Sequence, residues 1–231
     1  MIKIDVTVKG VMSVLQSRHP TPKEQAFITK RLNNVKAKDI TDEQQFAIHA
    51  YRTREGLFQM PSEMFEASMA AAAVNYKLPV KGMGKKTCKD LIKGGIIINP
   101  IELVFKNQKV NEKVTQDDIR NGTTAMAGFS IVNSKEEFID KETEGVVIDD
   151  VDVWHQDARW GRNANTRGAV WVVRPRIDNW ELDFEITLLQ DERISTDLLK
   201  EILEYAGAYV GVGAWRPKFG RFVITKWNVK K

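Results

Sequence analysis

Hydrophobic and polar residues alternate over residues 2–9, where isoleucine and valine occupy every second position. This period of two predicts a strand with one buried face. Farther along, the spacing of apolar residues predicts helices over 23–35, 42–53 and 62–76. The third of these begins just after Pro61, a residue that suits the first turn of a helix.

The second half of the chain carries further strand patterns. An apolar run over 96–105 predicts a strand that is bent or interrupted at Pro100. Residues 107–168 are weakly periodic and polar, and we expect an insertion with short strands there. Two alternating segments, 169–177 and 181–189, flank a three-residue turn and predict a β-hairpin.

The last part of the chain predicts a helix and a strand. Ser195 or Thr196 can cap a helix that runs to about Ala208, because their hydroxyl groups can accept from the first backbone amides. Apolar residues from Phe222 onward predict the final strand.

Without its insertions, the chain has the element order strand, helix, strand, strand, helix, strand. This is the βαββαβ order of ferredoxin-like, RNA-recognition-type domains. The sequence therefore predicts an α+β fold with an antiparallel sheet, in one domain over 1–231. A helical insertion is expected at about 11–60, and an insertion with a basic loop and an irregular β segment at about 77–168. Such a sheet has helices on one face and leaves the other face free to bind or to be covered.

Composition limits the classes of protein that the chain fits. It has 231 residues and one cysteine, Cys88, so no intramolecular disulfide can form, and Cys88 has no zinc-ligand set around it in the sequence. No apolar run approaches the ~20 residues that a membrane span needs. The first residues lack a signal-peptide pattern. We therefore expect a soluble, cytoplasmic protein that does not bind membranes.

The distribution of charge is more informative than the formal net charge of +4. Residues 77–93 contain six lysines and one acid, and residues 159–176 contain five arginines and no acid. Acidic residues gather instead at 136–152. Clustered cations beside an acidic segment indicate a binding face, although each cluster also fits an ordinary solvated surface.

The segment 211–221, with the sequence GVGAWRPKFGR, combines glycine, tryptophan and basic residues. Glycine lets the backbone turn through positive φ and approach a bulky partner closely. The basic side chains suit a phosphate backbone, and Trp215 offers a flat face for an unstacked base. The alternative interpretation is a helix C-cap and a tight turn, with Trp215 packed in the core.

Two further observations concern the remaining tryptophans. Trp160 lies in the apolar-poor stretch 159–167, so we predict that it contacts a ligand rather than the core. Trp171 and Trp180 flank the expected hairpin turn, and we predict that they pack together.

Three segments resemble a known family. The pattern Val-Gly-Val-Gly over 210–213, six further residues and then Gly-Arg-Phe over 220–222 resembles the glycine-rich loop of the RAMP superfamily, the CRISPR-associated RNA-binding proteins with ferredoxin-like domains. Residues 8–15 are similar to the first strand and turn of backbone subunits in class 1 CRISPR effector complexes. Residues 58–76 are similar to the segment where those subunits enter their first helix. The likeness covers about half of the chain and extends to small, stand-alone, phage-encoded relatives.

The resemblance implies a protein that lines single-stranded nucleic acid, often as a helical filament in which each subunit holds a few nucleotides. The glycines that match the loop are Gly211, Gly213 and Gly220. The lysines Lys85, Lys86 and Lys89 match only as a basic insertion after the first helix.

Catalytic and metal-binding patterns are weak. His19 and His155 could act as general acid or base in a metal-independent endoribonuclease, because the pKa of histidine lies near neutrality. His49 falls in an expected helix and is better explained by packing. The acids at 149–152 fit a solvated loop better than a cation site. The glycines and lysines of 82–87 lack the spacing of a phosphate-binding loop. We expect no catalytic residue, no metal and no cofactor.

The sequence thus favours a non-catalytic, sequence-tolerant protein that binds single-stranded RNA or DNA and assembles along it as a homo-oligomer, with other effector or phage proteins as further partners. Two alternatives stay open: a RAMP-type endoribonuclease, and a protein-interaction module or inhibitor that mimics an effector subunit. The residues predicted to contact nucleic acid are Lys81, Lys85, Lys86, Lys89, Arg159, Trp160, Arg162, Arg167, Gly211, Gly213, Trp215, Arg216, Lys218, Gly220 and Arg221.

Overall fold

The computed structural model describes residues 1–19, 49–53, 57–78, 86–106, 154–162, 168–189 and 193–230, with the backbone alone at 154–156 and 162. The chain forms two compact units. The first, here the core unit, comprises 1–14, 60–106 and 178–231. The second unit comprises 15–59 and 107–177. The second unit therefore takes most of its residues from the regions where the sequence predicts insertions, together with residues 169–177, which were expected to be a strand of the core.

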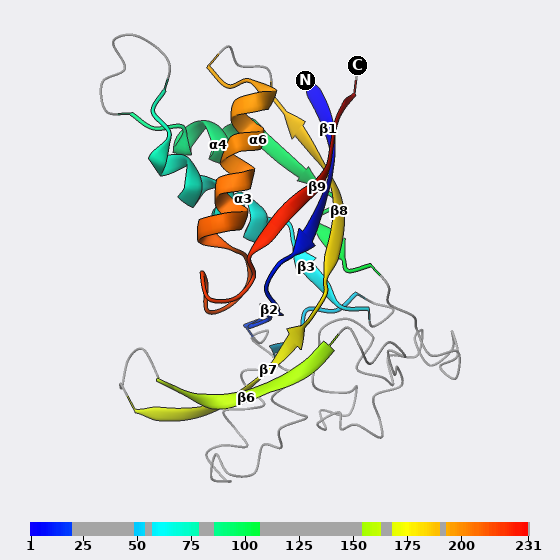
Figure 1. Ribbon diagram of the computed structural model, residues 1–231, viewed down its shortest axis with the longest axis vertical. Helices are drawn as coiled ribbons and strands as arrows, with labels where there is room; N and C mark the ends of the chain where they lie inside the picture. The colour runs from blue at the N-terminus through cyan, green and yellow to red at the C-terminus, as the bar shows by residue number, and fades with distance from the viewer. Residues whose placement is uncertain are drawn as a thin grey trace. The chain divides into compact units, whose positions relative to one another are not determined.

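A four-stranded sheet forms the centre of the core unit, in the order β4-β8-β1-β9 (Figure 1). Its strands are β1 (Ile2–Gly10), β4 (Ile96–Asn99), β8 (Glu181–Leu188) and β9 (Phe222–Lys230). Each neighbouring pair is antiparallel, and a register shift interrupts the β1–β9 pairing between Thr7 and Val8. The fold is α+β, as the sequence predicts.

Helices lie along one face of this sheet (Figure 1). They are α3 (Glu63–Ala72), which continues as the 3₁₀ turn η2 (Ala73–Asn75), α4 (Lys89–Gly95), and α6 (Thr196–Tyr205), which continues as the π-helical turn η3 (Ala206–Val210). Ser195 caps α6, since its hydroxyl oxygen accepts from the amide of Leu198 at 3.1 Å. The expected strand at 2–9 and the helices at 62–76 and 195–208 are thus present with small shifts at their ends.

The core lies between this face and the helices. The alternate side chains Ile4, Val6 and Val8 of β1 are buried, as are those of β8 from Leu182 to Leu188. The Phe65 ring of α3 lies 5.0 Å from Phe184 and 5.3 Å from Phe222, measured between ring centroids. The alternate apolar side chains of these strands therefore form one apolar face of the sheet, and the helices cover that face.

Two smaller sheets complete the described structure. β3 (Gln59–Pro61) pairs with β5 (Glu102–Val104), and a three-stranded sheet has the order β2-β7-β6. Its strands are β2 (Val14–Leu15), β6 (Trp154–Arg162) and β7 (Ala169–Ile177). Since Asn99–Pro100 separates β4 from β5, the interruption expected at Pro100 is present.

The predicted hairpin of 169–177 and 181–189 is wrong. β7 pairs with β6 and β2, whereas β8 pairs with β1 and β4. Both edges of each strand are taken, so two strands adjacent in the sequence belong to different sheets. Asn179, between them, has a φ of 52°. Alternation identified both strands correctly, but it carries no information about which edges pair.

Two other expectations need correction. The helix predicted over 42–53 does not reach its expected end, because Arg52 forms a β-bridge with Phe58 and the amide of Thr53 donates to the carbonyl of Leu57 at 2.8 Å. The sequence analysis did not predict α4, because this helix has only seven residues and the last two are glycines, which disfavour helices. The helix predicted over 23–35 lies outside the described residues.

Candidate nucleic-acid interface

The glycine loop, residues 211–221, has a packed base. Gly211, Gly213 and Gly220 have φ values of 75°, 77° and 74°, a backbone conformation that residues other than glycine rarely adopt. At Gly220 a Cβ atom would lie 1.8 Å from the carbonyl oxygen of Val212, and at Gly211 it would lie 2.9 Å from that of Phe219. These glycines are therefore required by the fold of the loop itself.

Hydrogen bonds attach this base to the rest of the core unit. The Ser68 hydroxyl of α3 donates to the carbonyl of Gly211 at 2.8 Å, and the amide of Gly211 donates to Ala206 at 2.7 Å. The amide of Gly220 donates to the carbonyl of Ser13 at 2.8 Å. The loop is thus fixed to α3, to the π-helical turn and to the segment between β1 and β2.

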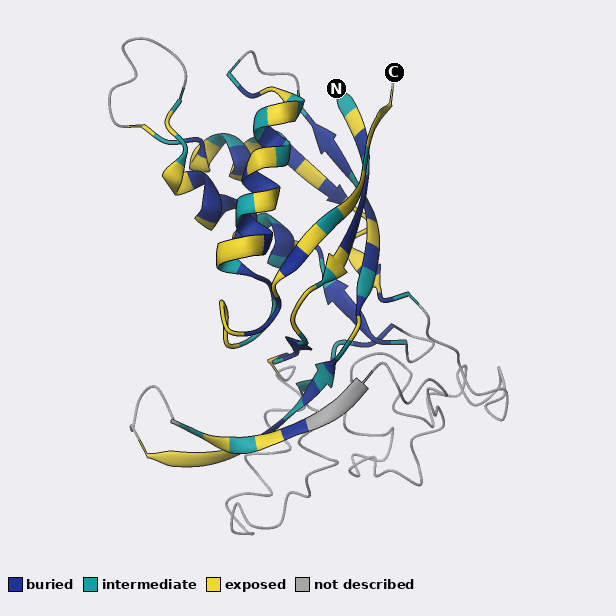
Figure 2. Cartoon of the chain, in the orientation of Figure 1, coloured by how far each residue is buried: buried dark blue, intermediate teal, exposed yellow. Residues whose placement is uncertain are grey.

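The tip of the loop has the opposite character (Figure 2). Residues 215–218 and Arg221 are exposed, whereas Phe219 is buried beneath them. Trp215 has a φ of 57° and its ring centroid lies 6.3 Å from that of Phe219, so the indole rests on a buried ring and keeps 36% of its surface exposed. The structure therefore separates the loop into architectural glycines and an exposed cationic tip, a division that the sequence did not show.

The predicted lysine cluster is described only in part. Lys86 and Lys89 are exposed at the start of α4, whereas Lys81 and Lys85 lie outside the described residues. The backbone before α4 is held by the amide of Cys88, which donates to the carbonyl of Tyr76 at 2.9 Å. Lys86 and Lys89 thus belong to the same unit as the glycine loop, and they lie just before α4 and at its first residue.

In the second unit, Trp160 lies opposite Trp171 in the β6–β7 register. The two rings meet edge to face at 5.5 Å, with 67% of Trp160 and 37% of Trp171 exposed. Trp160 is therefore outside the core, as predicted. The predicted packing of Trp171 on Trp180 is wrong, because Trp180 is buried in the core unit against Phe105 and Phe222.

The arginines of β6 divide between the two faces of the ribbon. Arg159 contacts the buried carboxylate of Asp157 two residues earlier, on the face opposite Trp160. The backbone places Arg162 at the position that shares the face of Trp160, opposite Ala169. Arg167 lies outside the described residues. Sequence reasoning missed Trp171 as the partner of Trp160, because residues 107–168 are weakly periodic and no strand with defined bounds was expected there.

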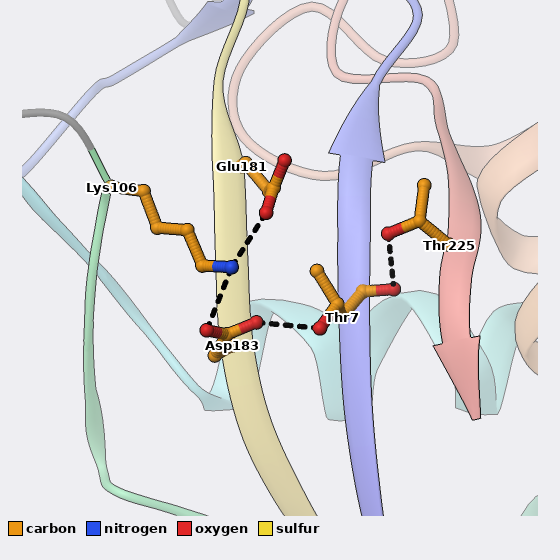
Figure 3. A network of polar contacts seen from close by, with 5 residues as sticks. All are labelled: Thr7, Lys106, Glu181, Asp183 and Thr225. Atoms are coloured by element: carbon orange, nitrogen blue, oxygen red, sulfur yellow. Dashed lines mark hydrogen bonds and ion pairs between the residues drawn. The ribbon is translucent and has the colours of Figure 1, made fainter. Parts of the chain in front are cut away.

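The outer face of the core sheet, opposite the helices, carries paired charges. Asp5 lies directly opposite Glu185, and the ammonium group of Lys230 contacts their carboxylates at 2.7 Å and 2.8 Å. Burial raises the pKa of Asp183, but hydrogen bonds from Lys106 and Thr7 outweigh this effect and lower its pKa. Figure 3 shows this second group, in which Lys106 joins Glu181 and Asp183.

The described part of this outer face thus offers acids already bound to cations. Three carboxylates come from β8 alone, at Glu181, Asp183 and Glu185, because successive odd positions face the same side. Trp227 is half-buried on β9 at the position opposite the buried Val6. The exposed Lys226 also lies on this face, opposite Thr7, so the described part of the face mixes acids with cations.

The histidines show no catalytic arrangement within the described ranges. His19 is exposed, and the side chain of His155 is not described. Burial lowers the pKa of His49 to about 4, with Arg174, Arg18 and His19 adding to the effect and a backbone hydrogen bond to Arg18 opposing it. Among the described residues, no group of three or more His, Cys, Asp or Glu side chains could hold a metal ion. None of the described helices is long and apolar enough to cross a membrane.

No family model matches the chain, and no curated protein matches it significantly.

Proposed function

We propose that this protein binds single-stranded nucleic acid through its glycine loop, in a sequence-tolerant manner, and assembles along the strand as a homo-oligomer. The observation that carries the proposal is the division of the loop. Buried glycines with positive φ fix its base, and Trp215, Arg216, Lys218 and Arg221 are exposed at its tip. Cations for phosphates and an aromatic ring for a base are the two components of sequence-tolerant binding.

The core sheet supports a ferredoxin-like core for this function. The order β1, α3, β4, β8, α6 and β9 along the chain, leaving out the other elements, agrees with the element order of a βαββαβ unit. The loop then follows the second helix, where the RAMP resemblance places the glycine-rich loop. The paired charges on the outer sheet face favour binding at the loop rather than across the sheet.

The second unit, taken by itself, offers a candidate surface for unstacked bases. Trp160 and Trp171 expose an aromatic pair on the β6–β7 ribbon, and stacking on such rings contributes about 1–3 kcal/mol per base. If each subunit neutralises about six phosphates, the logarithm of affinity would fall with the logarithm of salt with a slope of about −4.

Fluorescence anisotropy with labelled single-stranded RNA and DNA of mixed sequence, at several salt concentrations, tests the proposal. We expect salt-sensitive binding, with complexes that grow in size as the oligonucleotide lengthens. Arg216→Glu with Lys218→Glu should abolish binding. The matched control, Lys93→Glu with Lys226→Glu, changes the net charge equally at exposed positions outside the loop and should weaken binding far less. Equal losses from both pairs, or no binding at low salt, would refute the proposal.

A further inference from the structure

A short segment beside the glycine loop exposes two consecutive apolar side chains. Val11 and Met12 follow β1 directly, and 60% of Val11 and 44% of Met12 is accessible. Single exposed apolar residues are ordinary on protein surfaces. Two exposed apolar residues in succession, next to a cationic loop, form a small apolar surface whose backbone is held by specific contacts.

The backbone of this segment is attached at every residue. The amides of Val11 and Met12 both donate to the carbonyl of Arg221, at 2.9 Å and 3.2 Å. The carbonyl of Ser13 accepts from the amide of Gly220 at 2.8 Å. Hydrogen bonds therefore join this segment to Gly220 and Arg221, at the end of the glycine loop.

Trp180 fixes the same segment from its other side. Its indole Nε1–H donates to the carbonyl of Met12 at 2.9 Å, and its own carbonyl accepts from the amide of Gly10 at 2.8 Å. A Cβ atom at residue 10 would lie 2.3 Å from this indole nitrogen, so glycine is needed for the approach. Trp180 itself is buried.

These contacts fix the backbone of the segment and leave its two apolar side chains exposed. The backbone of the segment is therefore ordered before any ligand binds. A surface that is already ordered loses little conformational entropy on binding, so its apolar contacts contribute more of their full value. The exposed charges of the segment's immediate neighbours, Lys9 and Arg221, are both positive.

We propose that Val11 and Met12 form an apolar contact for unstacked bases of the strand whose phosphates the glycine loop binds. The inference rests on the proposed function and adds to it a second kind of contact at the same site. The loop cations attract the phosphates, and the pinned segment takes the flat faces of bases, which every sequence offers.

The salt dependence of binding separates the two kinds of contact. Burying apolar side chains releases no counterions, whereas each lost phosphate contact reduces the slope by about 0.7. Val11→Ser with Met12→Ser should therefore weaken binding of single-stranded oligonucleotides about tenfold and leave the salt slope unchanged. Arg216→Ala with Lys218→Ala should instead reduce the slope by about 1.4. Val74→Ser, at a valine that is 49% exposed on η2, is the matched control and should leave affinity unchanged.

The outcomes distinguish this inference from the proposed function. Unchanged affinity in the Val11/Met12 variant, with a reduced slope in the Arg216/Lys218 variant, would overturn the inference and leave the loop proposal standing. No effect of either variant would overturn both. Weaker binding accompanied by a lower midpoint of thermal unfolding would indicate a structural role and would also count against the inference. A loss of binding to a protein partner alone would assign the patch to protein contact and would overturn it too.

Discussion

Replacing Gly220 by alanine tests whether the loop glycines act through architecture. Two costs can be worked from the structure. A residue with a side chain at a φ of 74° costs about 1–2 kcal/mol. The added Cβ would also lie 1.8 Å from the carbonyl oxygen of Val212, and forcing an extra methyl group into a packed site costs about 1–3 kcal/mol. We therefore expect Gly220→Ala to lower the free energy of unfolding by about 2–5 kcal/mol.

The chain offers a matched control in Gly94, near the end of α4. A Cβ atom there would have no heavy atom within 4 Å, and Gly94 is not among the residues with positive φ. Alanine is about 0.5–1 kcal/mol better than glycine inside a helix, so Gly94→Ala should stabilise the protein by about that amount. The same chemical change is thus expected to act in opposite directions at two glycines of one unit.

Urea unfolding followed by far-UV circular dichroism measures both effects, because α3 and α6 supply helical signal from the core unit. A midpoint for Gly220→Ala within experimental error of the wild type would refute the reasoning, since neither the backbone conformation nor the close approach would then exist. Destabilisation by Gly94→Ala would contradict the second part. Gly207→Ala isolates the packing cost, because its Cβ would lie 2.3 Å from the carbonyl oxygen of Phe222 at a φ that is not positive.

Four further predictions follow from individual contacts. Because the pKa of His49 falls from 6.5 to about 4 on folding, the unfolded chain binds the proton more readily. Stability is then complete above pH 6.5 and decreases by up to about 3 kcal/mol as the pH falls to 4; unfolding of His49→Gln with the same pH dependence as the wild type would contradict this. Lys106→Met should raise the pKa of Asp183, which carboxyl NMR titration reads directly, and an unchanged midpoint would mean that the ion pair is absent in solution. Ser195→Ala should destabilise the protein by about 1 kcal/mol through loss of the α6 cap, and Ser195→Thr, which keeps the hydroxyl, should not. Trp160→Ala should weaken oligonucleotide binding by about 1–3 kcal/mol without changing the midpoint of unfolding much, and full retention of affinity would remove the ribbon from the interface.

The elements that sequence predicted well are those whose periodicity is set by burial against one layer. β1, β8, α3 and α6 all bury one regular side, so their positions could be read from residue spacing. Pairing could not be read in this way. β7 and β8 are separated by three residues, yet they do not pair with each other: β7 pairs with β6 and β2, and β8 pairs with β1 and β4. The choice depends on which edges meet rather than on the residue pattern within each strand.

The candidate site shows the same division between local and non-local information. The chemistry of residues 211–221 was visible as composition, but which of its residues would be buried was not. Gly220 is required because Val212 lies against it, and Trp215 is exposed because Phe219 takes the place beneath it. The residue pattern of the sequence does not predict that Val11 and Met12 are exposed beside the loop, since their position depends on contacts with Arg221 and Trp180.

The outer sheet face explains why the loop, rather than the sheet, is the stronger candidate. A sheet that binds single-stranded nucleic acid exposes aromatic rings and cations on its open face. Here β8 places a carboxylate at three successive outward positions, and Lys106 and Lys230 are already engaged by them. Those lysines would have to leave carboxylates in order to meet phosphates, which would leave the acids facing a polyanion. The tip cations Arg216 and Lys218 are exposed. Arg221, the last residue of the loop, donates to the carbonyl of Pro217 at 2.9 Å and adds a third positive charge. The outer face also carries the exposed Lys226, so acids and cations are mixed there, whereas the charged residues of the tip are all cationic. On this ground we expect a phosphate to bind at the loop in preference to the sheet.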